Sequence, residues 1–229
     1  INYRIDIIMS DKFKEIYKKS IEDPENFWRK AADDIFWFKK PTKILNKSNP
    51  PFYKWFEDGV TNTCYNALDI HIDNGQGQKT ALIYDSPITG NKSKLTYEQL
   101  RSKVSKFAGA LTNQGVKKGD RVIIYMPMIP EAVIAMLACG RIGAIHSVVF
   151  GGFASNELAS RIDDSKAKLL VTASCGFEHG RTVEYKPLVD EAIKIANHKI
   201  EKMILFQRQG HEVKLNTPIE VSWDDVVSN

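Results

Sequence analysis

Two short segments of this 229-residue chain have residue types that could contact a phosphorylated ligand. The first is an aromatic residue with two glycines at the end of an apolar run: Phe150, Gly151 and Gly152. Glycine has no Cβ, so its backbone can approach a ligand closely or adopt a positive φ angle. The second is a charged turn after another apolar run: Glu178, His179, Gly180 and Arg181. The guanidinium of Arg181 offers a planar fork of donors that suits phosphate oxygens.

Each segment also has a plainer interpretation. The glycine pair is typical of a tight turn from a strand into a helix, with no ligand. Arg181 could instead form a surface ion pair with Glu178 or Glu184. His179 as a general base is a weak hypothesis, because a lone histidine without an acidic partner to orient it is usually solvated. The residues alone leave these alternatives open.

The elements that would position both segments alternate between strand and helix. Apolar and β-branched runs predict strands at 81–84, 121–125, 145–149, 168–172 and 203–206. Helices are expected after the capping box Thr96–Gln99, from Pro130 to Gly143, from Ser155 and from Pro187, with one more start at Ser222. This alternation predicts an α/β fold, mainly a parallel sheet flanked by helices. Ligands gather at the carboxyl ends of such strands, where both segments lie.

Residues 1–75 differ from the α/β portion at 76–229. They contain three of the four tryptophans, together with several aromatic pairs, and Asp23-Pro24 predicts a helix start. Aromatic side chains bury much area per residue, so we expect a helical and irregular extension that packs on the α/β portion. A separate partner-binding surface is the alternative.

Composition excludes several classes of protein. Basic and acidic residues number 32 and 28, a balance that disfavours nucleic-acid binding. The nearest basic cluster reads as a solvated linker: Lys39, Lys40, Lys43 and Lys47. The three widely spaced cysteines disfavour a disulfide framework or a zinc site, and indicate a reducing compartment, the cytoplasm or the mitochondrial matrix. No apolar run approaches the roughly 18 residues of a membrane span.

The chain also lacks the common self-sufficient catalytic motifs. It contains no Walker-type phosphate loop, no dinucleotide fingerprint and no nucleophile elbow, and its five histidines show no metal-ligand spacing. We therefore expect neither a catalytic residue nor a metal site within these residues.

The long run from Tyr125 to Phe153 resembles the short-chain acyl-CoA synthetases, that is, the acetyl- and propionyl-CoA synthetases of the adenylate-forming family. Further stretches resemble the same family, among them 62–66, 95–100, 118–122 and 180–192. Together they cover nearly the whole chain. The last stretch is more similar to the propionyl branch, which includes the short-chain family member 3 type.

The resemblance implies a function in two steps. ATP converts a short carboxylic acid to an acyl-adenylate and diphosphate, and the thiol of coenzyme A then displaces AMP. The implied small molecules are the carboxylate, ATP with Mg²⁺, and coenzyme A, with no nucleic acid or membrane as partner. The ATP-phosphate loop, the acyl pocket and the catalytic lysine are expected beyond Asn229. The chain would then be the amino-terminal part of an AMP-forming ligase, truncated within its large domain and inactive alone. A catalytically inactive module that binds coenzyme A or a protein partner is the alternative.

The resemblance also assigns roles to both segments. It implies that the coenzyme A nucleotide lies beside Phe150, Gly151 and Gly152, that the four residues from Glu178 form its binding segment, and that Arg181 contacts phosphate. The acetyl branch has Arg at the position of Glu178. The propionyl branch tends to have Glu there, followed by Pro where this chain has His179.

Overall fold

A computed structural model describes residues 11–228 of the chain. The polypeptide divides into two compact units, Ile1–Thr61 and Asn62–Asn229.

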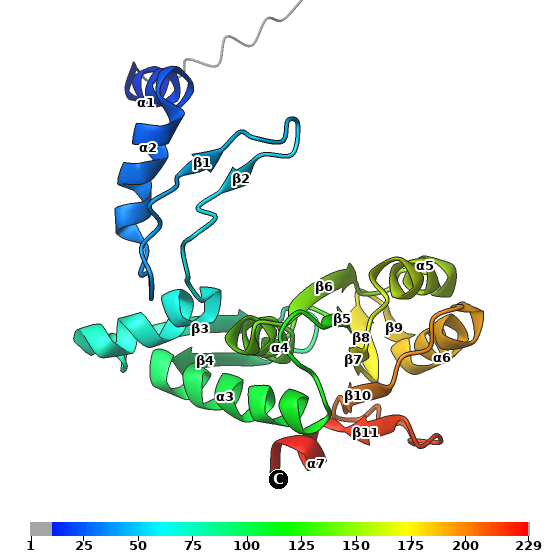
Figure 1. Cartoon of the computed structure of the whole chain (residues 1–229). Helices are drawn as coiled ribbons and strands as arrows, with labels where there is room; N and C mark the ends of the chain where they lie inside the picture. The colour runs from blue at the N-terminus through cyan, green and yellow to red at the C-terminus, as the bar shows by residue number, and fades with distance from the viewer. Residues whose placement is uncertain (1–10, 229) are drawn as a thin grey trace, which may run out of the picture. The chain divides into compact units, whose positions relative to one another are not determined.

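The first unit is a small helical and irregular assembly. It contains α1 (Asp11–Glu22), α2 (Pro24–Ala31), the short helix η1 (Ala32–Asp34) and the strands β1 (Leu45–Asn46) and β2 (Lys54–Trp55), which pair antiparallel (Figure 1). The predicted start of α2 is confirmed, because Asp23 accepts a hydrogen bond from the backbone of Asn26 at 3.2 Å. Its aromatic rings contact one another, as in the Trp28–Trp55 pair at 6.0 Å. Packing of this extension on the α/β portion stays a prediction.

Residues 62–76 belong to the second unit, although their sequence resembles the extension in character. They form two short helical segments, η2 (Tyr65–Asp69) and η3 (Ile72–Gln76). The side-chain amide of Asn62 donates to the backbone carbonyls of Gly140 and Arg141 at 2.9 and 3.1 Å, and Arg141 pairs with Asp69 at 2.7 Å. These contacts satisfy carbonyls at the end of a later helix, which fixes the segment there.

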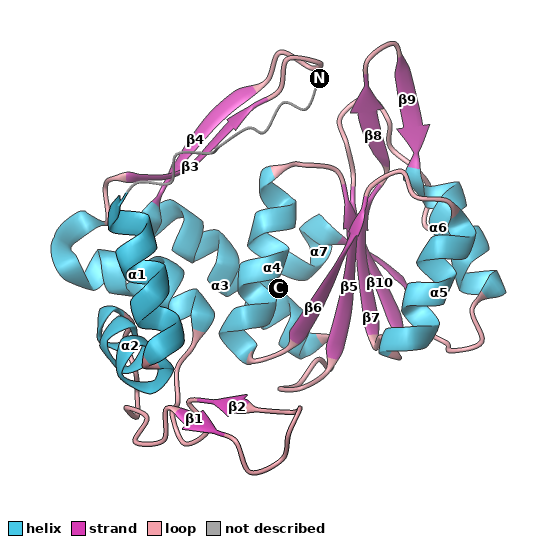
Figure 2. Ribbon diagram, turned by 90° about the horizontal axis from the view of Figure 1, so that it is seen from above, coloured by secondary structure: helices cyan, strands magenta, loops and turns pink. Residues whose placement is uncertain are grey.

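A parallel sheet of five strands forms the centre of the second unit, as the sequence predicts. The strands are β5 (Arg121–Met126), β6 (Ile145–Phe150), β7 (Leu169–Ala173), β10 (Lys202–Phe206) and β11 (Glu220–Ser222). Across the sheet they run β6, β5, β7, β10, β11, of which Figure 2 labels the first four. The chain moves outward from β5 to β6 and then crosses back to β7. The direction of progress therefore reverses between β5 and β7.

Helices cover both faces of this sheet, which confirms the predicted layers (Figure 2). One face packs against α3 (Tyr97–Asn113), α4 (Pro130–Ile142) and α7 (Trp223–Ser228), and the other against α5 (Ser155–Ser165) and α6 (Tyr185–Ile195). Alternate strand residues serve the two cores: Ile124 lies in the first, Ile123 and Tyr125 in the second. Among the described residues, no helix is long and apolar enough to span a membrane.

Helix ends follow the sequence signals with two exceptions. The Thr96–Gln99 capping box is present, and Gly143 ends α4 with a φ of 74°. The helix expected from Ser155 begins there, but a capping role for the Ser155 hydroxyl is wrong, because Ala154 holds the cap position without a side-chain bond. The helix expected to open at Pro187 begins two residues earlier, at Tyr185. Proline is tolerated in this first turn, where backbone N–H groups have no partner within the helix.

Two antiparallel hairpins lie outside the parallel sheet. The predicted strand at 81–84 is part of β3 (Thr80–Asp85), which pairs with β4 (Lys92–Thr96) and not with the central sheet. The charged turn is the tip of a second hairpin, formed by β8 (Cys175–Glu178) and β9 (Arg181–Glu184). This hairpin interrupts the expected direct passage from β7 to α6.

Candidate ligand site at the carboxyl edge of the sheet

A cavity of about 340 Å³ lies beyond the carboxyl ends of β5 and β6. Its lining comes from four segments distant in sequence and from two separate residues: 84–87 at the end of β3, 126–129 at the end of β5, 148–151 at the end of β6, 176–178 in β8, and Tyr185 and Arg208. In open parallel sheets, ligands bind beyond the carboxyl ends of the strands, where the direction of strand progress reverses. The cavity adjoins that place, because the reversal falls between β5 and β7 and residues that follow each of these strands, 126–129 and 176–178, line the cavity.

The two segments singled out from the sequence meet here. Phe150, Gly151 and Glu178 line the cavity directly. Gly152 lies next to them, since a Cβ at this position would be 3.6 Å from Glu178 Oε1. The remaining predicted residues lie at the exposed hairpin tip, outside the lining: His179, Gly180 and Arg181. The second segment therefore contributes one wall residue and an exposed rim.

The structure gives a physical reason for glycine at both positions of the first turn, Gly151 and Gly152. A Cβ on Gly151 would collide with the Tyr185 hydroxyl and lie 3.0 Å from the backbone oxygen of Met126. Gly152 has a φ of 95°, and its N–H donates to the Tyr125 hydroxyl at 3.2 Å. That hydroxyl donates in turn to the backbone oxygen of Phe153 at 2.8 Å. A buried tyrosine thus fixes a turn whose open backbone can approach a ligand.

The hairpin tip has a paired charge. Gly180 takes a φ of 75° in the turn, and the Arg181 guanidinium donates to Glu178 Oε2 at 2.7 Å. The alternative of a surface ion pair with Glu178 is therefore what the structure shows. The Arg181 side chain is 71% exposed, and exposed pairs of this kind contribute at most about 1 kcal/mol. A polyanion could replace the carboxylate at little cost.

Two residues of the cavity floor were not singled out from the sequence. Tyr185 is 3% exposed, and its ring lies 4.9 Å from that of Tyr125. Burial raises the pKa of Tyr185 to about 12, so the hydroxyl keeps its proton at neutral pH. Arg208 is 9% exposed, with its guanidinium carbon 4.7 Å from the ring centroid of Phe177. Arg208 could have been found by its place, since it follows the carboxyl end of β10.

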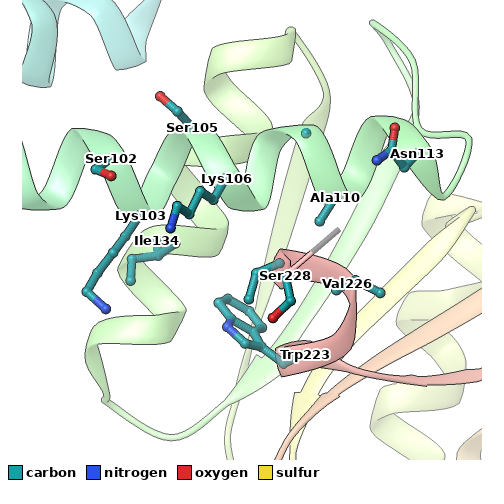
Figure 3. Close-up of a pocket in the computed structure, with 12 residues that line it drawn as sticks. Ser102, Lys103, Ser105, Lys106, Ala110, Asn113, Ile134, Trp223, Val226 and Ser228 are labelled. Atoms are coloured by element: carbon teal, nitrogen blue, oxygen red, sulfur yellow. The ribbon is translucent and has the colours of Figure 1, made fainter.

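A larger cavity of about 730 Å³ lies away from both turns, between α3, α4 and α7 (Figure 3). Figure 3 shows Trp223 and Ser228 of α7 facing Lys103 and Lys106 of α3. Trp223 stacks on Phe107 with ring centroids 3.8 Å apart, so this region belongs to the packing of α7 on α3. It contains none of the residues predicted for ligand contact.

The cysteines of the described chain are buried and unpaired. Burial raises the pKa of Cys139 to about 12, so it behaves as a small apolar residue. Among residues 11–228, no group of His, Cys, Asp and Glu could hold a metal ion.

The chain matches known proteins along almost its whole length. The family model of AMP-binding enzymes matches residues 71–227, and that of the acetyl-coenzyme A synthetase N-terminus matches residues 13–67. Acyl-CoA synthetase short-chain family member 3 from Rattus norvegicus, a mitochondrial protein, is 53% identical over 215 residues, which are 93% of this chain and 32% of that protein. Acetyl-coenzyme A synthetase from Streptomyces coelicolor is 46% identical over 213 residues, again 93% of this chain and 32% of that protein.

A solved structure shows the same fold. Acetoacetyl-CoA synthetase from Streptomyces lividans superposes with a TM-score of 0.80 at 22% sequence identity, covering 93% of this chain and 32% of that chain. The chain therefore spans about a third of the length of the proteins that it matches.

Proposed function

Because the chain belongs to the AMP-binding enzyme family, we propose that it is the amino-terminal part of an AMP-forming short-chain acyl-CoA ligase. The resemblance to short-chain acyl-CoA synthetases expected from the sequence is confirmed by the two family models and the relatives. The whole protein would join acetate or propionate to coenzyme A, with ATP converted to AMP and diphosphate.

One observation supports a specific role for this part of the ligase. The glycine turn and the charged hairpin, 26 to 31 residues apart along the chain, meet at one cavity near the reversal point of the sheet. The coenzyme A nucleotide would lie beside Phe150, Gly151 and Gly152, with the backbone of the turn close to it. Phe150 is 69% exposed and offers an aromatic face to a base.

The hairpin would supply the anion contact. Arg181 would bind a phosphate group, assisted by His179 and by the backbone at Gly180. Glu178 now accepts the hydrogen bond from Arg181 and would have to release it, since a carboxylate beside a polyanion is unfavourable. Breaking the ion pair between Glu178 and Arg181 costs little free energy at an exposed tip. The pair would therefore exist only while no nucleotide is bound.

The ATP and Mg²⁺ sites, the acyl pocket and the catalytic lysine would lie in polypeptide beyond Asn229. The described residues contribute no cluster suited to a metal ion, and the relatives are about three times as long as the chain. The name of the rat relative gives a mitochondrial location, which supports the mitochondrial one of the two reducing compartments expected from the sequence.

The test uses the full-length protein and an arginine substitution. Arg181→Ala should raise the KM for coenzyme A about 10- to 100-fold, because hydrogen bonds to charged groups contribute about 1.5–3 kcal/mol. ATP–diphosphate exchange with acetate or propionate should stay unchanged, since adenylation does not use coenzyme A. Arg161→Ala is the matched control, because Arg161 is an exposed arginine on α5 away from the cavity.

Three outcomes are decisive. If exchange falls as much as thioester formation, the role of Arg181 is wrong. If the intact protein forms no acyl thioester from either acid, the ligase proposal fails. Calorimetric binding of coenzyme A without any turnover would favour the inactive binding module.

A further inference from the structure

We infer that Arg208 and Tyr185 form an anion-binding floor in the same cavity, which takes phosphate oxygens of the coenzyme A nucleotide. This inference rests on the proposed function, and it adds two residues that neither the sequence motifs nor the comparisons assign. Three features support it: the burial of both side chains, the lack of partners for their donors, and the charge balance of the lining.

Arg208 is held in place by its backbone, which leaves the guanidinium available. Its N–H donates to Ser174 Oγ at 2.8 Å, and its carbonyl accepts from the N–H of His211 at 2.9 Å. The side chain stacks on Phe177, another residue of the lining. Among the described residues, the guanidinium makes no hydrogen bond or ion pair, although Arg208 is only 9% exposed.

Tyr185 has a comparable position. Its hydroxyl lies where a Cβ on Gly151 or on Gly176 would collide with it, so both glycines leave room for this group. It makes no hydrogen bond to any residue of the described chain, while the neighbouring Tyr125 hydroxyl has two. The hydroxyl faces the cavity, so an acceptor on a ligand would take its hydrogen bond in place of water.

Arg208 has no ion pair with the other charged residues of the lining. Asp85 pairs with Lys92 at 2.9 Å, and without a nucleotide Glu178 pairs with Arg181 at 2.7 Å, so neither carboxylate is bonded to Arg208. Glu131 of α4 lines an adjoining cavity together with Arg208, without an ion pair between them. Burial raises the pKa of Glu131, and the nearby positive charges of Lys103 and Arg208 act against this rise.

A buried guanidinium without a counter-ion costs free energy, and a bound anion recovers it. Coenzyme A has two kinds of phosphate that could do so, its diphosphate and its 3′-phosphate. Both present the same kind of phosphate oxygen to the planar fork of an arginine. Comparing coenzyme A with 3′-dephospho-coenzyme A distinguishes the two phosphate groups.

The test measures the full-length enzyme with coenzyme A and with 3′-dephospho-coenzyme A. Arg208→Gln should raise the KM for coenzyme A about 10- to 100-fold while ATP–diphosphate exchange is unchanged. Arg208→Lys should recover part of this loss, since it restores the charge but not the fork. Tyr185→Phe should raise the same KM by about 10-fold or more, because a hydrogen bond to a charged acceptor contributes about 1.5–3 kcal/mol. Arg208→Gln should also weaken the dependence of KM on salt.

A loss confined to coenzyme A would support contact with the 3′-phosphate, and an equal loss for both nucleotides would support contact with the diphosphate. The inference is overturned if Arg208→Gln leaves both KM values unchanged in an enzyme whose wild type forms thioesters. It is also overturned if the variant lowers thermal stability and impairs exchange to the same degree, because Arg208 would then be structural. Failure of the wild type to form any thioester instead overturns the proposed function.

Discussion

Two buried cations in the second unit have opposite surroundings. Lys186, at the start of α6, is 5% exposed and bonds to both oxygens of Asp190 at 2.6 and 2.7 Å and to Glu220 at 3.1 Å. Arg208, at the cavity floor, is 9% exposed and has no such partner among the described residues. The first cation connects α6 to the edge strand β11. The second faces a cavity.

The difference separates a charge that stabilises the fold from a charge that is available to a ligand. A buried charge whose partners are all supplied by the protein holds elements together, and its loss leaves the partner uncompensated. A buried charge without a partner in the protein does not hold elements together, and a ligand that pairs with it offsets its desolvation cost. The following predictions test that distinction in the full-length protein.

Lys186→Met should lower the free energy of unfolding by about 3 kcal/mol, because Glu220, with a side chain 3% exposed, keeps a buried charge without its cation. Chemical denaturation measures this change. Lys194→Met is the matched control on the same helix, since that side chain is 75% exposed and should change stability by less than about 0.5 kcal/mol. Adding Glu220→Gln should restore part of the loss. An equal change in the free energy of unfolding for the two lysine variants would contradict the structural role of Lys186.

Gly151→Ala should destabilise the protein by about 1–3 kcal/mol, because the added Cβ overpacks the floor against the Tyr185 hydroxyl. The control is Gly109→Ala in α3, where a Cβ meets nothing within 4 Å and should stabilise the helix by about 0.5–1 kcal/mol. Combining Gly151→Ala with Tyr185→Phe should relieve part of the strain. A Gly151→Ala variant as stable as the wild type would show that the floor is not closely packed.

Acid should weaken the Lys186 cluster. Burial raises the pKa of Glu220, but hydrogen bonds from Asn216, Thr217 and Lys186 outweigh this effect and place the pKa below its ordinary value of 4.5. A lowered folded-state pKa stabilises the protein above pH 4.5, and this contribution is lost as pH falls through the folded value. Glu220→Gln should therefore show a shallower loss of stability in acid. An unchanged slope would contradict this role.

Arg208→Met should change the free energy of unfolding by no more than about 1 kcal/mol, since only the cation–π contact with Phe177 is lost. Thermal unfolding beside Lys186→Met gives a direct contrast. A loss as large as that of Lys186→Met would mean that Arg208 has a structural partner.

Much of the fold was predictable from local signals. The runs around Ile123 and Leu170 predicted buried parallel strands, and the Thr96–Gln99 box and Pro130 marked helix starts that the structure confirms. The meeting of the two turns was also predictable in outline, because the carboxyl ends of parallel strands share one edge. The pairing of β3 with β4 was not predictable, because an isolated apolar run does not indicate which strand it pairs with.

The sequence by itself determined the α/β architecture, the family and the two turns, because these depend on periodicity, capping and contiguous motifs. Only the tertiary structure decided that Arg181 pairs with Glu178 at an exposed tip, and that Tyr185 and Arg208 form the cavity floor. Burial and pairing depend on which distant residues come together. The spacing of residues along the chain does not show that Lys186 pairs with Asp190 and Glu220 while Arg208 has no ion pair among the described residues.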